Sequence, residues 1–108
     1  MMNQMIMVGR LTRETEFKEE NGEKVAILSI AVPRSYKNKD GIYETDFIDF
    51  VARGTIGEHV AEYCEKGDIL GIKGHAESKK QEDNNYKIEL IADKVTFLSS
   101  RKEEIEEV

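Results

Sequence analysis

The residues most able to carry out catalysis are few in this chain of 108 residues, and their spacing joins none of them into a site. His59 falls in a predicted helix, His75 falls in a predicted strand, and the single cysteine, Cys64, lies on the apolar stripe of the helix. This spacing fits neither a metal site nor a nucleophile beside a general base. No glycine-rich turn opens a helix with a following Lys-Ser or Lys-Thr pair, so no phosphate-binding loop is expected. The sequence therefore predicts no catalysis, no metal and no cofactor.

Two adjacent stretches carry side chains suited to binding. Residues Arg34 to Gly41 are polar and basic, include one aromatic residue and close on Asp-Gly, which predicts a projecting loop. The stretch from Glu44 to Arg53 alternates as a strand does, with apolar residues on one face. Its other face carries Thr45, Phe47, Asp49, Val51 and Arg53. This second face is the informative one, because an exposed phenylalanine costs solubility unless something covers it.

Strands and one helix are expected to position these residues. The chain opens with a strand from Asn3 to Leu11 that is apolar on both faces and therefore needs cover on both. Asn21-Gly22 marks a hairpin, and Pro33 is expected to end the hydrogen-bond ladder of its second arm. A helix is predicted from a Thr55 cap to about Lys66, with Gly67 after its end. The remaining segments are a strand from Asp68 to about Ser78, a polar loop from Lys79 to Asn85, and a strand from Tyr86 through Phe97 with an irregularity at Asp93.

The order of these elements favours one fold class. Three strands, a helix and two further strands match an all-β, five-stranded OB-fold Greek-key barrel with one short helix between strands 3 and 4. An ordinary α+β sheet covered by one helix would give a similar order, so the pattern alone leaves both open.

Size and charge exclude some classes of protein. A chain of this length makes one domain, which argues against a multidomain enzyme. Its net charge of −6 disfavours a simple electrostatic hold on duplex DNA or on an anionic membrane, but leaves local binding of nucleic acid open. The sequence contains no apolar stretch near the roughly 18 residues of a membrane span, and the N-terminus lacks a basic leader. With its lone cysteine, the protein is expected to be cytoplasmic.

Several fragments, taken in order, resemble one known family. Asn3-Gln-Met-Ile-Met-Val-Gly-Arg-Leu-Thr12 resembles that family's first strand, and Asn21-Gly22 its first hairpin turn. The fragments that match further along are Ala31-Val-Pro-Arg-Ser-Tyr36, Asp46-Phe-Ile48, Val60-Ala-Glu-Tyr-Cys-Glu-Lys-Gly67 and Ala92-Asp-Lys-Val-Thr-Phe-Leu98. The family is that of the bacterial single-stranded-DNA-binding proteins. The resemblance implies an OB-fold domain over residues 1–98, a short acidic tail over residues 99–108, and sequence-tolerant binding of single-stranded DNA in replication, recombination or repair.

The resemblance also assigns roles to particular residues. Tyr36 and Phe47 correspond to aromatic residues on which bases stack. Arg53 stands where the family usually carries an aromatic residue, and its planar guanidinium can stack on a base as well as pair with phosphate. Gln81 stands at another such position and offers no stacking face. Each retained residue also has a simpler explanation: Tyr36 packing on the barrel rim, Phe47 covered by another subunit, and Arg53 solvated.

Cations are expected to line the path of the DNA phosphates. The residues predicted for this role are Arg10, Arg34, Lys37, Lys73, Lys79 and Lys80. Charged side chains are more often simply solvated, and Asp49 and Glu77 fall on the same strand faces as the expected ligand. An uninterrupted cationic groove is therefore not expected.

Oligomer formation and partner recruitment are further expectations. The doubly apolar first strand and the resemblance imply a homotetramer, with a dimer as the alternative. The tail ends Glu103-Glu-Ile-Glu-Glu-Val108, which is either a reduced tip that recruits replication and repair proteins or a solubilising end. The chain resembles a short, core-only member of bacterial or mobile-element origin.

A second function from a different class remains open. The same barrel is able to serve as a protein-interaction adaptor of the primosome type, with an acidic surface that docks basic partners and little or no DNA binding. The negative charge and the two replaced aromatic positions favour this alternative slightly.

Overall fold

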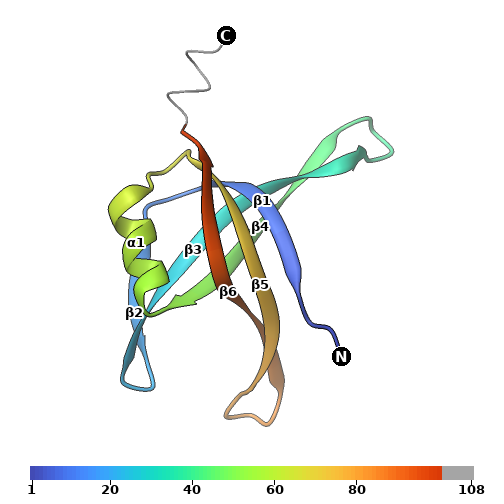
Figure 1. Cartoon of the computed structure of the whole chain (residues 1–108). Coiled ribbons are helices and arrows are strands. Elements are labelled where there is room, and N and C mark those ends of the chain that lie inside the picture. The colour runs from blue at the N-terminus through green and yellow to red at the C-terminus, as the bar shows by residue number, and fades with distance from the viewer. Residues whose placement is uncertain (101–108) are drawn as a thin grey trace.

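The computed structural model describes residues 1–100, which form six strands and one helix (Figure 1). The strands are β1 Met5–Leu11, β2 Glu16–Glu20, β3 Glu23–Lys37, β4 Tyr43–Arg53, β5 Ile69–Lys80 and β6 Tyr86–Ser99, and the helix is α1 Thr55–Tyr63. The strands follow the order β1-β5-β6-β4-β3-β2, and β1 also pairs with β3. This second pairing closes the sheet into a barrel, which confirms the predicted fold class.

The first strand of the barrel is divided, so the structure has six strands where five were predicted. Both β1 and β2 run antiparallel along β3, with Leu11 opposite Ile30 and Glu16 opposite Ile27. Four residues of the chain, 12–15, therefore lie against only two residues of β3. This excess interrupts the ladder and allows the chain to bend from the barrel into the β2–β3 hairpin.

The β3–β4 hairpin projects from the barrel as an arm, which we define as residues 33–45 (Figure 1). Pro33 was expected to end the ladder and to be followed by a loop up to Gly41, and this prediction is wrong. Pro33 pairs with Thr45, the register shifts, and pairing resumes between Lys37 and Tyr43. Proline removes one donor, but the extended backbone that it favours continues the strand past the irregularity. The strand β5 is also longer than predicted, since it extends to Lys80 and includes the first two residues of the expected loop.

The core fills the barrel and the space beneath α1. Phe50 and six other large apolar side chains are fully buried, and Val60 of α1 packs against them. The helix begins after Gly54, whose positive φ of 65° sets the entry turn, so Thr55 is the first helical residue and not the cap that was predicted. It also ends at Tyr63, three residues early, because Cys64 has an extended backbone, and Gly67 then donates a backbone hydrogen bond to the Leu11 carbonyl of β1. Within residues 1–100, no helix combines the length and the apolar character needed to cross a membrane.

A bulge at Asp93 interrupts the pairing of β5 with β6, as the sequence predicted. Lys73 lies opposite Lys94 and Gly74 lies opposite Ala92, so Asp93 faces no residue of β5 in the register. The extra residue bends β6 and aims the Asp93 side chain at His75.

Candidate nucleic-acid interface

A groove of about 340 Å³ lies on the outer side of the barrel, between β4 and β6. Its lining includes Lys18, Phe47, Asp49, Lys87, Ile88 and Glu89. Phe47 is 76% exposed, because alternation along β4 turns Phe50 and the partly buried Ile48 toward the core and Phe47 outward. Ser29 of β3 donates a hydrogen bond to Asp49, which fixes that carboxylate beside the groove. The groove therefore offers a flat apolar ring with lysines nearby, which suits a base and its phosphates.

Arg53 shares the outer face of β4 with Phe47, as predicted, but carboxylates surround it. Its guanidinium nitrogens lie 3.5 Å from Glu89 of β6, 3.6 Å from Glu20 of β2 and 4.0 Å from Glu77 of β5. A ligand that uses Arg53 must therefore compete with these three glutamates for the guanidinium.

A test of this competition is the change Glu89→Gln. It should raise affinity for single-stranded oligo(dT) by about two- to fivefold, the size expected when one partly exposed charge pair is released. Glu62→Gln on the exposed side of α1 changes the net charge equally and serves as the control. Fluorescence anisotropy at low salt measures both variants, and equal affinities would show that Glu89 does not restrain Arg53.

His75 extends this charged network along β5 and β6. Its Nδ1 lies 2.8 Å from Asp93 and its Nε2 lies 2.7 Å from Glu77, and Lys79 donates to the other oxygen of Glu77 at 2.9 Å. The hydrogen bonds with Asp93, and then those with Glu77, raise the pKa of His75 above its ordinary 6.5. Those from His75 and then Lys79 lower the pKa of Glu77 to about 2. Glu77 therefore stays charged at every pH at which His75 titrates.

The raised pKa of His75 makes stability depend on pH. Protonated His75 stabilises the folded chain below pH 6.5, and this contribution is lost as the pH rises from 6.5 through the raised value. Urea midpoints of the wild type should exceed those of His75→Gln at about pH 5.5 and approach them at about pH 8.5. A gap between the two proteins that does not change with pH would contradict this assignment.

The arm places its aromatic and basic residues on two opposite sides. Arg34 is held by Asp46, 2.9 Å from its Nη2, and by Glu44, 2.7 Å from its Nη1. Hydrogen bonding with Asp46 raises the pKa of Arg34 and lowers that of Asp46, so the pair stays charged. Since side chains alternate along β4, Asp46 and Arg34 lie on the side opposite Phe47. Arg34 therefore links β3 to β4 within the arm.

The second side of the arm carries an aromatic residue that the sequence analysis did not single out. Tyr43 alternates with Thr45 and Phe47 toward the groove side, and the Lys37 ammonium lies 5.6 Å from the centre of its ring. Because Lys37 faces Tyr43, its neighbour Tyr36 points to the Arg34 side, where it is 62% exposed. Phe47 and Tyr36 are therefore both accessible but lie on different sides of the arm.

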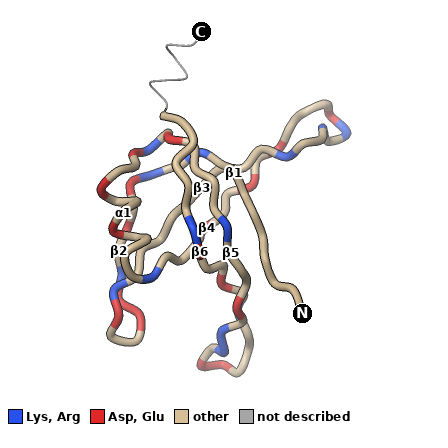
Figure 2. The backbone as a smooth tube through the Cα atoms, viewed as in Figure 1, with Lys and Arg blue, Asp and Glu red and all other residues tan. Residues whose placement is uncertain are grey.

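The other predicted cations are spread over the barrel. Arg10 donates to the Gly67 carbonyl at 2.7 Å, and Lys73 lies beside Ile6 of β1, two strands from β4. Lys79 lies on the outer face with Glu77, and Lys80 lies opposite Tyr86 near the tip of the β5–β6 hairpin. Lysine and arginine alternate with aspartate and glutamate along all three hairpins (Figure 2), in agreement with the expected interruption of any cationic groove. Of this predicted set, Lys79 lies on the groove face of the barrel with Arg53, and Lys37 lies on the groove side of the arm.

Lys18 and Lys87 are basic residues of the groove that sequence reasoning missed. Lys87 lies directly opposite Lys79, and Lys18 reaches the groove from β2. A signal was present for Lys87, since it alternates with Ile88 in the last strand. No local signal pointed to Lys18, because its position in the groove depends on the pairing of β2 with β3.

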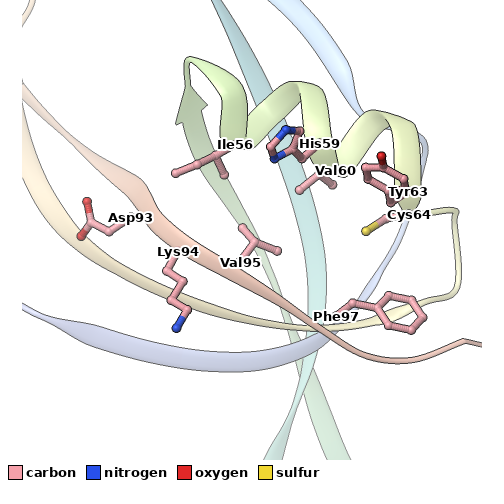
Figure 3. Close-up of a pocket in the computed structure, with 9 residues that line it drawn as sticks. All are labelled: Ile56, His59, Val60, Tyr63, Cys64, Asp93, Lys94, Val95 and Phe97. Atoms are coloured by element: carbon pink, nitrogen blue, oxygen red, sulfur yellow. The ribbon is translucent and has the colours of Figure 1, made fainter.

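A second hollow of about 330 Å³ lies between α1 and β6 (Figure 3). Its lining includes His59, Tyr63, Cys64 and Phe97. Burial raises the pKa of the Cys64 thiol, so the group stays protonated near neutral pH. Within residues 1–100, no group of three or more histidine, cysteine, aspartate or glutamate side chains is placed to hold a metal ion.

A closed barrel with one helix between β4 and β5 and a groove beside β4 defines the class of OB-fold binding domains. The model of the single-strand binding protein family matches residues 2–98, and the chain belongs to this family. The predicted resemblance is therefore confirmed.

Relatives and a solved structure agree with this assignment. The chain is 34% identical to single-stranded DNA-binding protein B of Bacillus subtilis, over 96% of each chain, and 36% identical to single-stranded DNA-binding protein 3 of Listeria innocua, over 94% of this chain and 67% of the relative. A Plasmodium falciparum SSB, solved in complex with ssDNA, matches with a TM-score of 0.73 at 23% identity, covering 92% of this chain and 96% of its own. That structural match confirms the OB-fold.

Proposed function

We propose that this protein binds single-stranded DNA with little regard to sequence, by stacking bases on Phe47 and pairing phosphates with lysines. The observation that carries this proposal is the 76% exposure of Phe47 in a groove that also holds Lys18 and Lys87. Stacking tolerates every base because every base has a flat face. Membership of the single-strand binding protein family and the names of the relatives support the same ligand.

The proposed path of the DNA starts at Phe47 and passes Arg53 and Lys79 on the same face. Tyr36 remains a proposed stacking residue, which the strand reaches by crossing the edge of the arm. On the groove side Tyr43 offers a stacking face between Phe47 and the tip of the arm. In this proposal Arg34 stabilises the arm, since its guanidinium already forms ion pairs with Asp46 and Glu44. Phosphate contacts remain predictions for Lys37, Lys80, Arg10 and Lys73.

The proposed biological unit is a homo-oligomer, with a tetramer expected and a dimer as the alternative. Ile6 and Val8 of β1 are both exposed, although Met5 and Met7 of the same strand pack against the core. A second copy of the chain would cover this apolar pair. Mass photometry or sedimentation distinguishes the two assemblies. The proposed recruiting tip, within residues 101–108, lies outside the described residues.

The adaptor function is not favoured. The acidic net charge and the two replaced aromatic positions favour it slightly, but family membership and the names of the relatives point to nucleic acid. In this proposal the protein acts in the cytoplasm, on the single strands exposed during replication, recombination or repair.

The decisive experiment is an anisotropy titration of labelled oligo(dT) at two salt concentrations with duplex competitor. Binding that resists duplex DNA and weakens by about 0.7 log units per neutralised phosphate for each tenfold rise in salt supports the proposal. If a folded protein shows no binding at low salt, the proposed function is wrong.

A further inference from the structure

His75 lies on the outer face of β5 with a carboxylate at each of its two ring nitrogens. The bulge brings the Asp93 carboxylate 2.8 Å from Nδ1, and Glu77, two residues along β5, lies 2.7 Å from Nε2. An ionised carboxylate only accepts hydrogen bonds, and a neutral imidazole carries a single N–H, so a neutral ring can satisfy only one of the two groups. This geometry therefore requires the imidazolium, in which both nitrogens donate.

The Glu77 carboxylate also contacts two cations on the proposed path of the DNA. Its Oε1 accepts a hydrogen bond from Lys79 at 2.9 Å and lies 4.0 Å from a guanidinium nitrogen of Arg53, while its Oε2 accepts from His75. The four side chains are all partly exposed, so a DNA phosphate can reach the two cations. Glu77 thus divides its charge between His75 and the cations that a phosphate needs.

Loss of the His75 proton should change this division. The neutral ring keeps one N–H, and Asp93 retains it, because within residues 1–100 Asp93 pairs with His75 alone. Glu77 would then face the lone pair of Nε2, which repels it, and would move toward Lys79 and Arg53. Since a phosphate has to displace Glu77 from those two cations, its binding weakens.

Charged side chains surround His75 on three strands. They are Lys73, Glu77 and Lys79 of β5, Glu89, Asp93 and Lys94 of β6, and Arg53 of β4. On β1 the neighbouring residues, Met5 and Ile6, carry no charge. Lys73 and Lys94 lie opposite each other, and within residues 1–100 neither forms an ion pair, so both disfavour a charged ring. The two carboxylates in direct contact outweigh them, in agreement with the raised pKa of His75.

We propose that His75 is a positioning residue of the DNA site, which as an imidazolium holds Glu77 back from full pairing with Arg53 and Lys79. Its deprotonation releases Glu77 to these cations, so binding of single-stranded DNA weakens as the pH rises. This inference rests on the proposed binding of single-stranded DNA. It adds a dependence on pH that stacking of bases on Phe47 does not supply.

The test is the pH profile of binding to labelled oligo(dT), measured by anisotropy from about pH 5.5 to about pH 9 at one low salt concentration. Wild-type affinity should fall about two- to fivefold as the pH rises from 6.5 through the raised pKa of His75. His75→Gln should show the lower affinity at every pH. His59→Gln should keep the wild-type profile and is the matched control, since His59 is the other histidine and lies by the hollow next to α1.

Two further measurements separate an effect through Glu77 from a direct effect of the histidine charge. Glu77→Gln should lose most of the pH dependence, because no carboxylate is left to be released. Calorimetric titration with oligo(dT) at about pH 7.5, in two buffers of different ionisation enthalpy, should show that the wild type takes up protons on binding and that His75→Gln does not. The uptake follows because protonation and DNA binding favour each other to the same extent.

The outcomes distinguish this inference from the proposed function. If the wild type does not bind single-stranded DNA at any pH, the proposed function fails and the inference fails with it. If the wild type binds with the same pH profile as His75→Gln, the function stands and this inference is overturned. Full pH dependence in Glu77→Gln also overturns it, because the histidine charge would then act on the DNA directly.

Discussion

Replacing Phe47 with alanine should weaken binding of single-stranded DNA by about 5- to 150-fold, the range expected for the loss of one base stack. Phe47 is exposed and its side chain supports no part of the core, so the variant should fold normally. The loss should be similar at low and high salt, because a stacked ring releases no counterions. Anisotropy titrations at two salt concentrations measure both quantities.

Phe97→Ala is the matched control for this prediction. Phe97 is also an exposed phenylalanine, but it lies by the hollow next to α1. Unchanged affinity in Phe47→Ala, with unchanged folding by circular dichroism, would mean that Phe47 is covered by protein and that the bases lie elsewhere.

Gly74→Ala should lower the free energy of unfolding by about 3 kcal/mol, the upper part of the range for overpacked cores. A Cβ atom at this position would overlap the backbone carbonyl of Ile91 and lie 3.1 Å from the Phe50 ring. A backbone carbonyl cannot move aside as a flexible side chain does, so β5 and β6 would have to separate beside the Asp93 bulge. Urea denaturation gives the change in stability.

Gly71→Ala on the same strand provides the comparison. There the nearest atom to an added Cβ is Leu98 Cδ1 at 3.6 Å, an ordinary contact. Its free energy of unfolding should stay within about 1 kcal/mol of the wild type. Equal stability of the two variants would show that the close approach at Gly74 relaxes without cost.

Local patterns predicted the outer face of β4 and the bulge. Alternation from Glu44 to Arg53 placed Phe47 and Arg53 together, because a strand turns successive side chains to opposite faces whatever it pairs with. The irregularity at Asp93 was visible because the apolar period changes parity there. The resemblance then selected the barrel from two folds with the same order of elements.

The charged network could not be predicted, because it depends on register between distant strands. Arg53 and Glu89 are 36 residues apart and meet only when β6 lies beside β4. The arm was missed for a related reason: Pro33 was taken to end a strand, but the long pairing of β3 with β4 carries the strand past it. The same pairing determines which residues of the arm share a side. No local pattern in the sequence therefore indicated that Tyr36 and Phe47 lie on different sides.

The two ends of β6 meet different structural requirements. From Leu90 onward the strand belongs to the barrel, where Ile91 and Ala92 are buried, and only residues 86–88 are exposed on the hairpin. Because Asp93 faces no residue of β5, the residues before and after it each keep a partner on β5. The exposed residues 86–88 can therefore change their side chains, and with them ligand preference, while the rest of the strand keeps the packing that holds the domain together.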